Sequence, residues 1–285
     1  MMRQRIAAVW ITVAIMVAGA SSADVWAASN SGSSTAKRYM SDSNIIYLNP
    51  LVGVTRYEEP GLMENKGVMG GFEAGWTHWD WFMFDLSARW MYGRVDYNST
   101  NTGTVGGLTD QMYEVRTLFG YPLRYKKVLR FTPYIGLAYR YLSDDSSGKR
   151  TSTGHWGYKR ESNYYYSPVG AKIEWAISKR WVLGAHAEYD LFWNGRQISH
   201  LSDVDPNYSD ASNNQNSGYG IRGGLPIMYC PKRSSVRWVL EPYAHYWNVS
   251  ESNISVVTYR NTPVALGVEP DNKTLEVGVK IGIWF

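Results

Sequence analysis

The sequence predicts an all-β protein, a transmembrane antiparallel up-and-down β-barrel of about ten strands that follows a cleaved N-terminal signal peptide. Apolar and polar residues alternate with a period of two along many segments, and the chain opens with a short basic and then apolar leader. It is also rich in aromatic residues, with 22 Tyr and 13 Trp, although its mean hydropathy is −0.35. Such a chain is too polar for a helical membrane protein, but it suits strands with one apolar and one polar face.

Residues 1–27 have the pattern of a secretory signal peptide. Arg3 and Arg5 precede an uncharged apolar run over residues 6–19, and small residues lead to a cleavage site after Ala27. The apolar run is shorter than the roughly 20 residues that a membrane-spanning helix needs. We therefore predict a flexible N-terminal segment over residues 28–43 of the mature chain, followed by the barrel over residues 44–285.

Composition excludes several classes of function. The net charge is only +4 and contains no basic block, so nucleic acid is not an expected partner. Cys230 is the only cysteine, which excludes an internal disulfide. No linker divides the chain, and no phosphate-binding loop, dinucleotide glycine motif or paired-cysteine site is present, so we expect one domain, no cofactor and no metal.

The two-residue period is clearest at the end of the chain. Val277, Val279 and Ile281 fall on one face, whereas Glu276 and Lys280 fall on the other, and a helix would mix these sets. Followed along the chain, the period predicts ten strands, an even number as in single-chain bacterial barrels. These strands cover residues 44–57, 66–79, 81–97, 110–123, 130–143, 161–178, 181–198, 217–231, 236–250 and 271–285.

The connections between these strands alternate in length. Tight turns are expected at residues 78–80, 125–129, 178–180 and 232–235, and longer polar loops at residues 58–65, 98–109, 144–160, 199–216 and 251–270. Aromatic residues gather beside both kinds of connection, which a soluble β-sandwich would give no reason to do. Short periplasmic turns and long extracellular loops are typical of bacterial barrels, so both termini are expected in the periplasm and the long loops outside the cell.

The last strand resembles the C-terminal signature of Gram-negative outer-membrane β-barrel proteins. Apolar residues occupy alternate positions up to a terminal aromatic residue: Val277, Val279, Ile281, Ile283 and Phe285. The resemblance implies a small porin-like protein of the outer membrane, in contact with its lipid and lipopolysaccharide. It also implies that these five residues are the signal read by the barrel-insertion machinery.

If the apolar rows face lipid, the opposite rows direct a polar network into the lumen. Its predicted members are Glu73, Asp85, Arg89, Glu114, Arg116, Arg140, Lys172, Glu174, His186, Glu188, Asp190, Arg222, Arg237, Glu241, His245, Glu276 and Lys280. Acids and bases are nearly balanced in this set, and a ten-strand barrel is only slightly wider than one that its side chains fill. We therefore expect these charges to pair across the lumen, either as a structural core or beside a narrow path for a small solute.

A structural or narrow small-solute transport role, porin-like in kind, is the first functional prediction. The alternative is a surface binding or adhesion module, because the long loops are rich in Ser, Asn, Asp, Gly and Tyr. Tyr164, Tyr165 and Tyr166 form the best candidate patch for a surface ligand.

A hydrolase at the rim of the barrel is the second alternative. His186, Glu188 and Asp190 share one face of the seventh strand, and His245 points the same way, so a histidine beside carboxylates could act as a general base. The simpler interpretation is that each histidine pairs with a neighbouring acid.

Two enzyme classes use barrels of this size, the omptin proteases and lipid A-modifying enzymes. Omptins carry Asp-x-Asp and Asp-x-His pairs near the rim, whereas here Asp203-Val-Asp205 lies beside His200 and no Asp-x-His occurs. Lipid A deacylation would need a histidine and a serine on the lipid-facing surface. We therefore expect no enzymatic activity and assign no catalytic residue.

Overall fold

The computed structural model describes residues 35–232 and 234–285, so the predicted signal peptide over residues 1–27 lies outside the described residues. Within these described residues, two short helices, α2 (Thr35–Tyr39) and the 3-10 helix η1 (Leu201–Asp203), accompany strands and their connections. Over these two ranges, no helix combines the length and the apolar character needed to cross a membrane.

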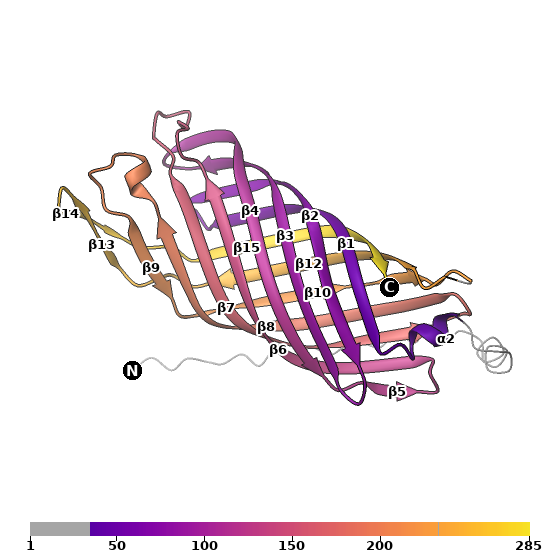
Figure 1. Ribbon diagram of the computed structural model, residues 1–285. Helices are drawn as coiled ribbons and strands as arrows, with labels where there is room; N and C mark the ends of the chain where they lie inside the picture. The colour runs from indigo at the N-terminus through magenta and orange to yellow at the C-terminus, as the bar shows by residue number, and fades with distance from the viewer. Residues whose placement is uncertain (1–34, 233) are drawn as a thin grey trace. The chain divides into compact units, whose positions relative to one another are not determined.

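The strands close into an antiparallel ten-strand barrel, as predicted (Figure 1). Each barrel strand pairs with its neighbours in sequence, and β15 pairs with both β12 and β1, so the barrel sheet has no free edge. The wall consists of β1 (Asn44–Glu59), β2 (Met63–Trp79), β3 (Met83–Ser99), β4 (Gly103–Gly120), β6 (Leu129–Asp145), β7 (Lys159–Ala176), β8 (Trp181–Ser199), β10 (Gly218–Gly224) with β11 (Ile227–Tyr229), β12 (Arg237–Val249) and β15 (Asn272–Trp284).

Prolines interrupt two of the predicted strands. The strand predicted over residues 217–231 divides into β10 and β11 around Pro226, and the strand over residues 110–123 ends before Pro122, after which β5 (Leu123–Tyr125) continues the pairing with β6. Proline has no N–H for the ladder. At the first break the ladder is replaced by irregular hydrogen bonds, in which Leu225 N donates to Pro242 O at 3.0 Å.

Several predicted loops are shorter or more ordered than expected. The polar loops predicted at residues 58–65 and 98–109 are turns over residues 60–62 and 100–102. Residues 199–216 contain β9 (Ala211–Gln215), which pairs with β8, and residues 251–270 contain a hairpin of β13 (Ser255–Tyr259) and β14 (Thr262–Gly267). These predictions were wrong because the period of two disappears in these segments. Residues 212–215 are polar at consecutive positions, whereas Val264, Ala265 and Leu266 are apolar at consecutive positions.

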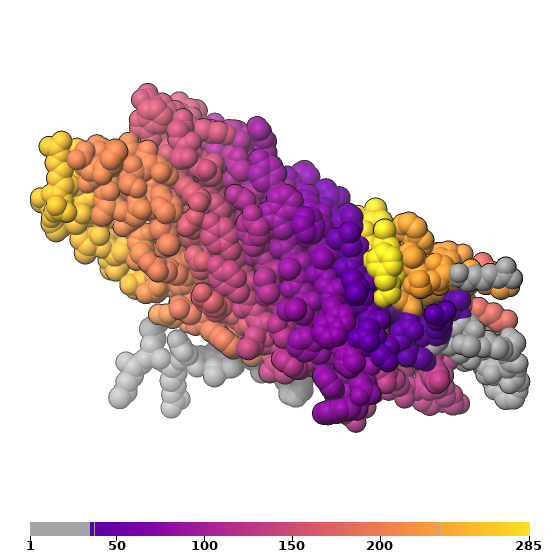
Figure 2. Space-filling model, in the orientation of Figure 1, coloured from indigo at the N-terminus to yellow at the C-terminus, as the bar shows by residue number. Residues whose placement is uncertain are grey.

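The barrel has two different ends. Helix α2, β5 and the C-terminus lie at one end, here named the turn end (Figure 1). The other end, named the long-loop end, carries β9, β13, β14 and the three longest connections, over residues 146–158, 200–217 and 250–271. At the turn end, Ile46 N donates to Phe285 O at 3.2 Å, and the first and last strands lie side by side in the surface view (Figure 2).

Helix α2 covers the lumen at the turn end. Ala36 and Tyr39 are fully buried, and the Tyr39 hydroxyl donates a hydrogen bond to Glu174. Ala36 N donates to Lys179 O at 3.2 Å. Residues 28–43 were expected to be flexible, but the described part from residue 35 onward is packed, because a few large side chains reach an apolar cluster that only the closed barrel creates.

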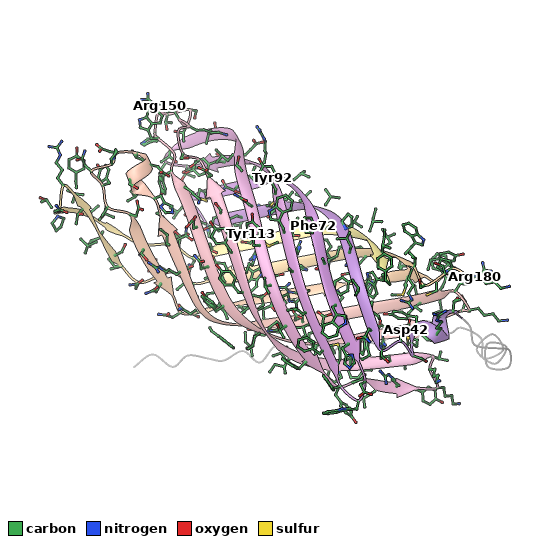
Figure 3. The ribbon with its side chains drawn as sticks, in the orientation of Figure 1. Asp42, Phe72, Tyr92, Tyr113, Arg150 and Arg180 are labelled. Atoms are coloured by element: carbon green, nitrogen blue, oxygen red, sulfur yellow. The ribbon has the colours of Figure 1, made fainter. Side chains whose placement is uncertain are left out.

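The outer wall has the pattern of a surface in contact with lipid. On β1, Ile46, Val52 and Val54 point outward and remain about half exposed. Exposed aromatic residues lie near both ends, and Tyr92 and Tyr113 belong to the band nearer the long-loop end (Figure 3). Two aromatic bands mark the two interfaces of a membrane.

Candidate functional site

A buried network of charges fills the centre of the lumen. Arg222 on β10 contacts three acids, with Nη1 3.0 Å from Glu114, Nη2 2.9 Å from Asp190 and Nε 2.9 Å from Glu188. Its guanidinium also donates to Tyr166 Oη at 2.9 Å. Because Glu114, Glu188 and Asp190 are each at most 4% exposed, this cluster blocks the lumen with paired charges.

A second part of the central network lies beside it. Arg89 pairs with Glu276, and its guanidinium donates to Tyr243 Oη at 3.0 Å. Tyr243 in turn donates to Glu276 at 2.6 Å. Arg116 completes the set by donating to Glu188 at 2.6 Å. These groups come from strands far apart in sequence, so the network also joins opposite walls of the barrel.

Further charges form pairs between the central network and the turn end. Lys280 lies 3.0 Å from Glu73 and 3.3 Å from Glu241. Arg130 donates to Glu174 at 2.6 Å, next to Tyr39 of α2. Arg130 is fully buried but was not among the predicted lumen residues. It points into the lumen like Thr132 and Tyr134, which lie at alternate positions of the same strand.

Some predicted lumen residues have partners of a different kind. Arg237 pairs with Asp42, which follows α2, rather than with an acid of the barrel wall. Lys172 lies 4.5 Å from the Trp79 ring, and Asp85 accepts a hydrogen bond from Thr77 at 2.6 Å. Among the described residues, neither Lys172 nor Asp85 forms an ion pair.

The histidines have separate partners. His186 Nε2 lies 3.0 Å from Glu241, as the pairing hypothesis predicts, but His245 Nδ1 lies 3.0 Å from Arg89. The prediction that each histidine pairs with an acid is therefore wrong for His245. The reason is that Arg222, Arg89 and Lys280 surround this side of the lumen.

His200 lies at the rim of the long-loop end. Its Nδ1 atom is 3.0 Å from Asp210 Oδ2, and its Nε2 atom is 3.4 Å from Glu161 Oε2. The Asp-x-Asp pair is not its partner, because Asp203 accepts a hydrogen bond from Lys159 N. Both ring nitrogens face carboxylates, so the contacts of His200 link β7 to the loop before β9.

The predicted tyrosine patch is not a patch. Tyr164 and Tyr166 are 2% and 0% exposed inside the lumen, and only Tyr165 is on the outer surface, at 48% exposed. Successive residues of a strand point to opposite faces, so three adjacent tyrosines of β7 cannot share one.

Cavities lie on both sides of the central network. A cavity of about 340 Å³, named the vestibule, opens at the long-loop end between Tyr97, Leu108, Trp156 and Val257. Below it lies the upper chamber, about 60 Å³, lined by Asn65, Asp110, Arg140, Asp144 and Met112 among others. A lower chamber of about 130 Å³ lies toward the turn end, where Tyr39, Asp85, Lys172 and Glu241 are among its lining residues.

The vestibule contains an acidic cluster that was absent from the predicted set. Arg160 Nη2 lies 2.6 Å from Glu59 and also contacts Glu269, which accepts a hydrogen bond from Tyr57 at 3.0 Å. Burial raises the pKa of Glu269, although Arg160 beside it favours the charged form. Glu59 and Arg160 lie at alternate positions that point into the lumen on β1 and β7. The alternation would have identified them if the predicted strands had reached the true strand ends.

The described residues hold no group of three or more His, Cys, Asp or Glu side chains that could bind a metal ion. The five residues of the predicted insertion signal lie on the outer face of β15 and just beyond it, with Val277, Ile281 and Phe285 about half exposed. Their recognition by the insertion machinery stays a prediction.

Solved structures with a similar fold are bacterial outer-membrane barrels. The outer membrane protease OmpT from Escherichia coli matches 86% of this chain and 96% of its own chain, with a TM-score of 0.59 and 9% identity. OprG from Pseudomonas aeruginosa (10% identity, 85% of this chain, 96% of that chain) and Neisserial surface protein A (9%, 84%, 96%) match with TM-scores of 0.35 and 0.34. At such identities the likeness concerns the fold alone.

The curated proteins contain no match to this sequence. The model of the autotransporter beta-domain family matches residues 59–227, which is more than half of the chain. The matched region runs from the end of β1 to the start of β11 and includes most of the barrel wall. The chain therefore belongs to the autotransporter beta-domain family.

Proposed function

We propose that this protein is a closed outer-membrane barrel that acts as a binding module at its long-loop end. The proposal rests on the difference between the centre of the lumen and its long-loop end. The centre is blocked by buried ion pairs around Arg222 and Arg89, whereas the long-loop end opens into a cavity of about 340 Å³. Cavities of roughly 300–1,000 Å³ are the usual size of small-ligand sites.

The proposal includes an orientation. The turn end and both termini face the periplasm, and the vestibule faces the outside of the cell. Support comes from the three longest connections, which all lie at the end opposite α2, because long loops on one side are typical of bacterial barrels.

A second candidate is passage of a small solute. The upper and lower chambers lie on opposite sides of the central network, so a rearrangement of its ion pairs would connect them. A rim hydrolase has less support, because both nitrogens of His200 already face carboxylates.

Conductance separates a closed barrel from a channel. Purified protein in planar bilayers is expected to give no conductance or only small, ion-sensitive steps, because buried ion pairs fill the lumen. Removing one pair in an Arg89→Ala/Glu276→Ala variant leaves the net charge unchanged and is expected to raise the conductance. The matched control is Arg56→Ala/Glu64→Ala, which removes an exposed pair. Large steps from the unmodified protein would contradict the proposal.

A further inference from the structure

The upper chamber is lined by buried polar atoms that have no hydrogen-bond partner in the described structure. They are Oδ1 of Asn65, Oδ1 of Asp110, Oδ1 of Asp144, Oγ of Ser143 and Nη1 of Arg140. Asn65 and Arg140 are only 2% and 4% exposed. A buried polar group without a partner destabilises a protein, so the concentration of such groups around one cavity points to a bound partner.

The two carboxylates of the chamber repel each other. Asp110 on β4 and Asp144 on β6 are register partners that both point inward, so their Cβ atoms lie about 4.5–5.5 Å apart. Asn65 Nδ2 donates to Asp144 Oδ2 at 2.6 Å, which leaves both Oδ1 atoms and the Asn65 carbonyl oxygen free to accept. Like charges in this position destabilise a sheet unless a cation bridges them.

Two cations, Arg160 and Arg140, line the chamber. Arg160 contacts Glu59, Glu269 and Tyr57. Arg140 stacks over the Trp247 ring at 5.3 Å and faces Glu114 and Glu276 of the central network. Neither guanidinium forms an ion pair with Asp110 or Asp144 among the described residues. When both carboxyl groups are ionised, they outnumber Arg140, the lining cation without an ion pair.

The two carboxylates of the chamber lie on the long-loop side of the outer aromatic band. Tyr113 belongs to the outer aromatic band (Figure 3), and Asp110 lies on the same strand, closer to the long-loop end. The chamber and the vestibule share Asp144 and Arg160 as lining residues, so a ligand in the vestibule can place one end in the chamber.

A protonated primary amine fits these groups. Its ammonium has three N–H donors, and the chamber offers three free acceptor atoms on Asn65, Asp110 and Asp144. The vestibule above supplies apolar walls from Leu108, Val257 and Val268 for a short alkyl chain. At its edge, Glu59 and Glu269 share the single cation Arg160, which leaves one negative charge for a second ammonium.

We infer that the long-loop end binds a short aliphatic diamine, with one ammonium group in the upper chamber and the alkyl chain in the vestibule. The inference rests on the proposed function and names its ligand class. The ammonium would donate hydrogen bonds to both Asp110 and Asp144 and so bridge the two carboxylates. Binding would therefore remove the repulsion within the chamber and pair its three free acceptors.

Isothermal titration of the purified barrel with cadaverine, the five-carbon diamine, tests this inference. Cadaverine is expected to bind, whereas pentanediol, which has no charge, is not. Pentamethonium, which keeps both charges but lacks N–H donors, is expected to bind at least about tenfold more weakly, because charge-assisted hydrogen bonds contribute about 1.5–3 kcal/mol. Absence of cadaverine binding, or equal binding of pentamethonium, would overturn the inference.

Substitutions locate the site. Asp110→Asn and Asp144→Asn are each expected to weaken cadaverine binding about tenfold or more, because each removes one charged acceptor. Asp145→Asn is the matched control, since Asp145 neighbours Asp144 but bonds only within its own turn, to Ser147. Equal losses in all three variants would indicate general charge attraction and reject the chamber as the site.

The affinity for cadaverine is expected to rise with pH. Burial raises the pKa of Asp110 and of Asp144, Asp144 raises that of Asp110 further, and Arg160 opposes both shifts. Glu59 and Asp145 also face Asp144 and raise its pKa. The amines stay protonated below about pH 9, so titration between about pH 5 and pH 8 reports the carboxyl groups, and affinity increases as they lose protons. A flat profile, or one that Asp110→Asn leaves unchanged, would contradict the inference.

The outcomes also separate this inference from the proposed function. A barrel that conducts freely yet binds cadaverine at Asp110 and Asp144 contradicts the closed lumen and supports the diamine site. A barrel that does not conduct and does not bind cadaverine contradicts the diamine site alone.

Discussion

Replacement of Arg222 by alanine is expected to lower the free energy of unfolding by about 3–5 kcal/mol, the largest effect of any single lumen substitution. Arg222 contacts Glu114, Glu188 and Asp190, and its side chain is only 2% exposed. Without it, Glu114 and Asp190 lose the one ion pair that each forms among the described residues, and only Glu188 keeps a pair, with Arg116. A buried charge that is left without its partner destabilises the protein by far more than the intact pair stabilises it.

Urea unfolding of barrels refolded in detergent micelles measures this effect. Arg196→Ala serves as the control, because the Arg196 side chain is exposed and, among the described residues, bonds only to Ser212. We expect it to change stability by less than about 0.5 kcal/mol. If Arg222→Ala fails to fold, Arg222→Lys provides a milder variant, which keeps the charge but loses the fork of contacts. A loss below about 1 kcal/mol for Arg222→Ala would mean that the network contributes little.

Gly71→Ala is expected to destabilise the barrel by about 2–3 kcal/mol or more. Gly71 on β2 points inward where β3 approaches closely, and an added Cβ atom would overlap the carbonyl oxygen of Trp90. That oxygen belongs to the backbone of the neighbouring strand, so the clash can be relieved only by moving the strand. We therefore expect the β2–β3 register to weaken around this position.

Gly70 gives a matched control for this substitution. A Cβ atom at Gly70 would lie 3.8 Å from its nearest neighbour, Leu51 O, which is an ordinary contact. Gly70→Ala should therefore leave the unfolding midpoint nearly unchanged, or raise it slightly because alanine reduces the entropy of the unfolded chain. Heat-modifiability on a gel and urea unfolding would compare the two variants, and equal behaviour would refute the steric explanation.

The period of two was sufficient to predict the ten strands and the faces of many residues. It assigned Arg222, Glu114 and Glu276 to the inward rows because the direction of a side chain depends only on its parity within one strand. It failed where this local signal ends. The ends of β1, β6 and β7 were missed together with Glu59, Asp144 and Arg160, because the alternation fades there. Asp110 was the first residue of a predicted strand but was not included in the inward set.

The partners of the inward residues could not be predicted in the same way. Arg89 meets Glu276, although 187 positions separate them, only because β15 pairs with β1 and β12 and closes the barrel. The same closure brings Asn65 to Asp144 and creates the apolar cluster on which Tyr39 packs. Parity is a property of each strand alone, whereas contacts across a lumen depend on the closure and stagger of all strands, which no local pattern records.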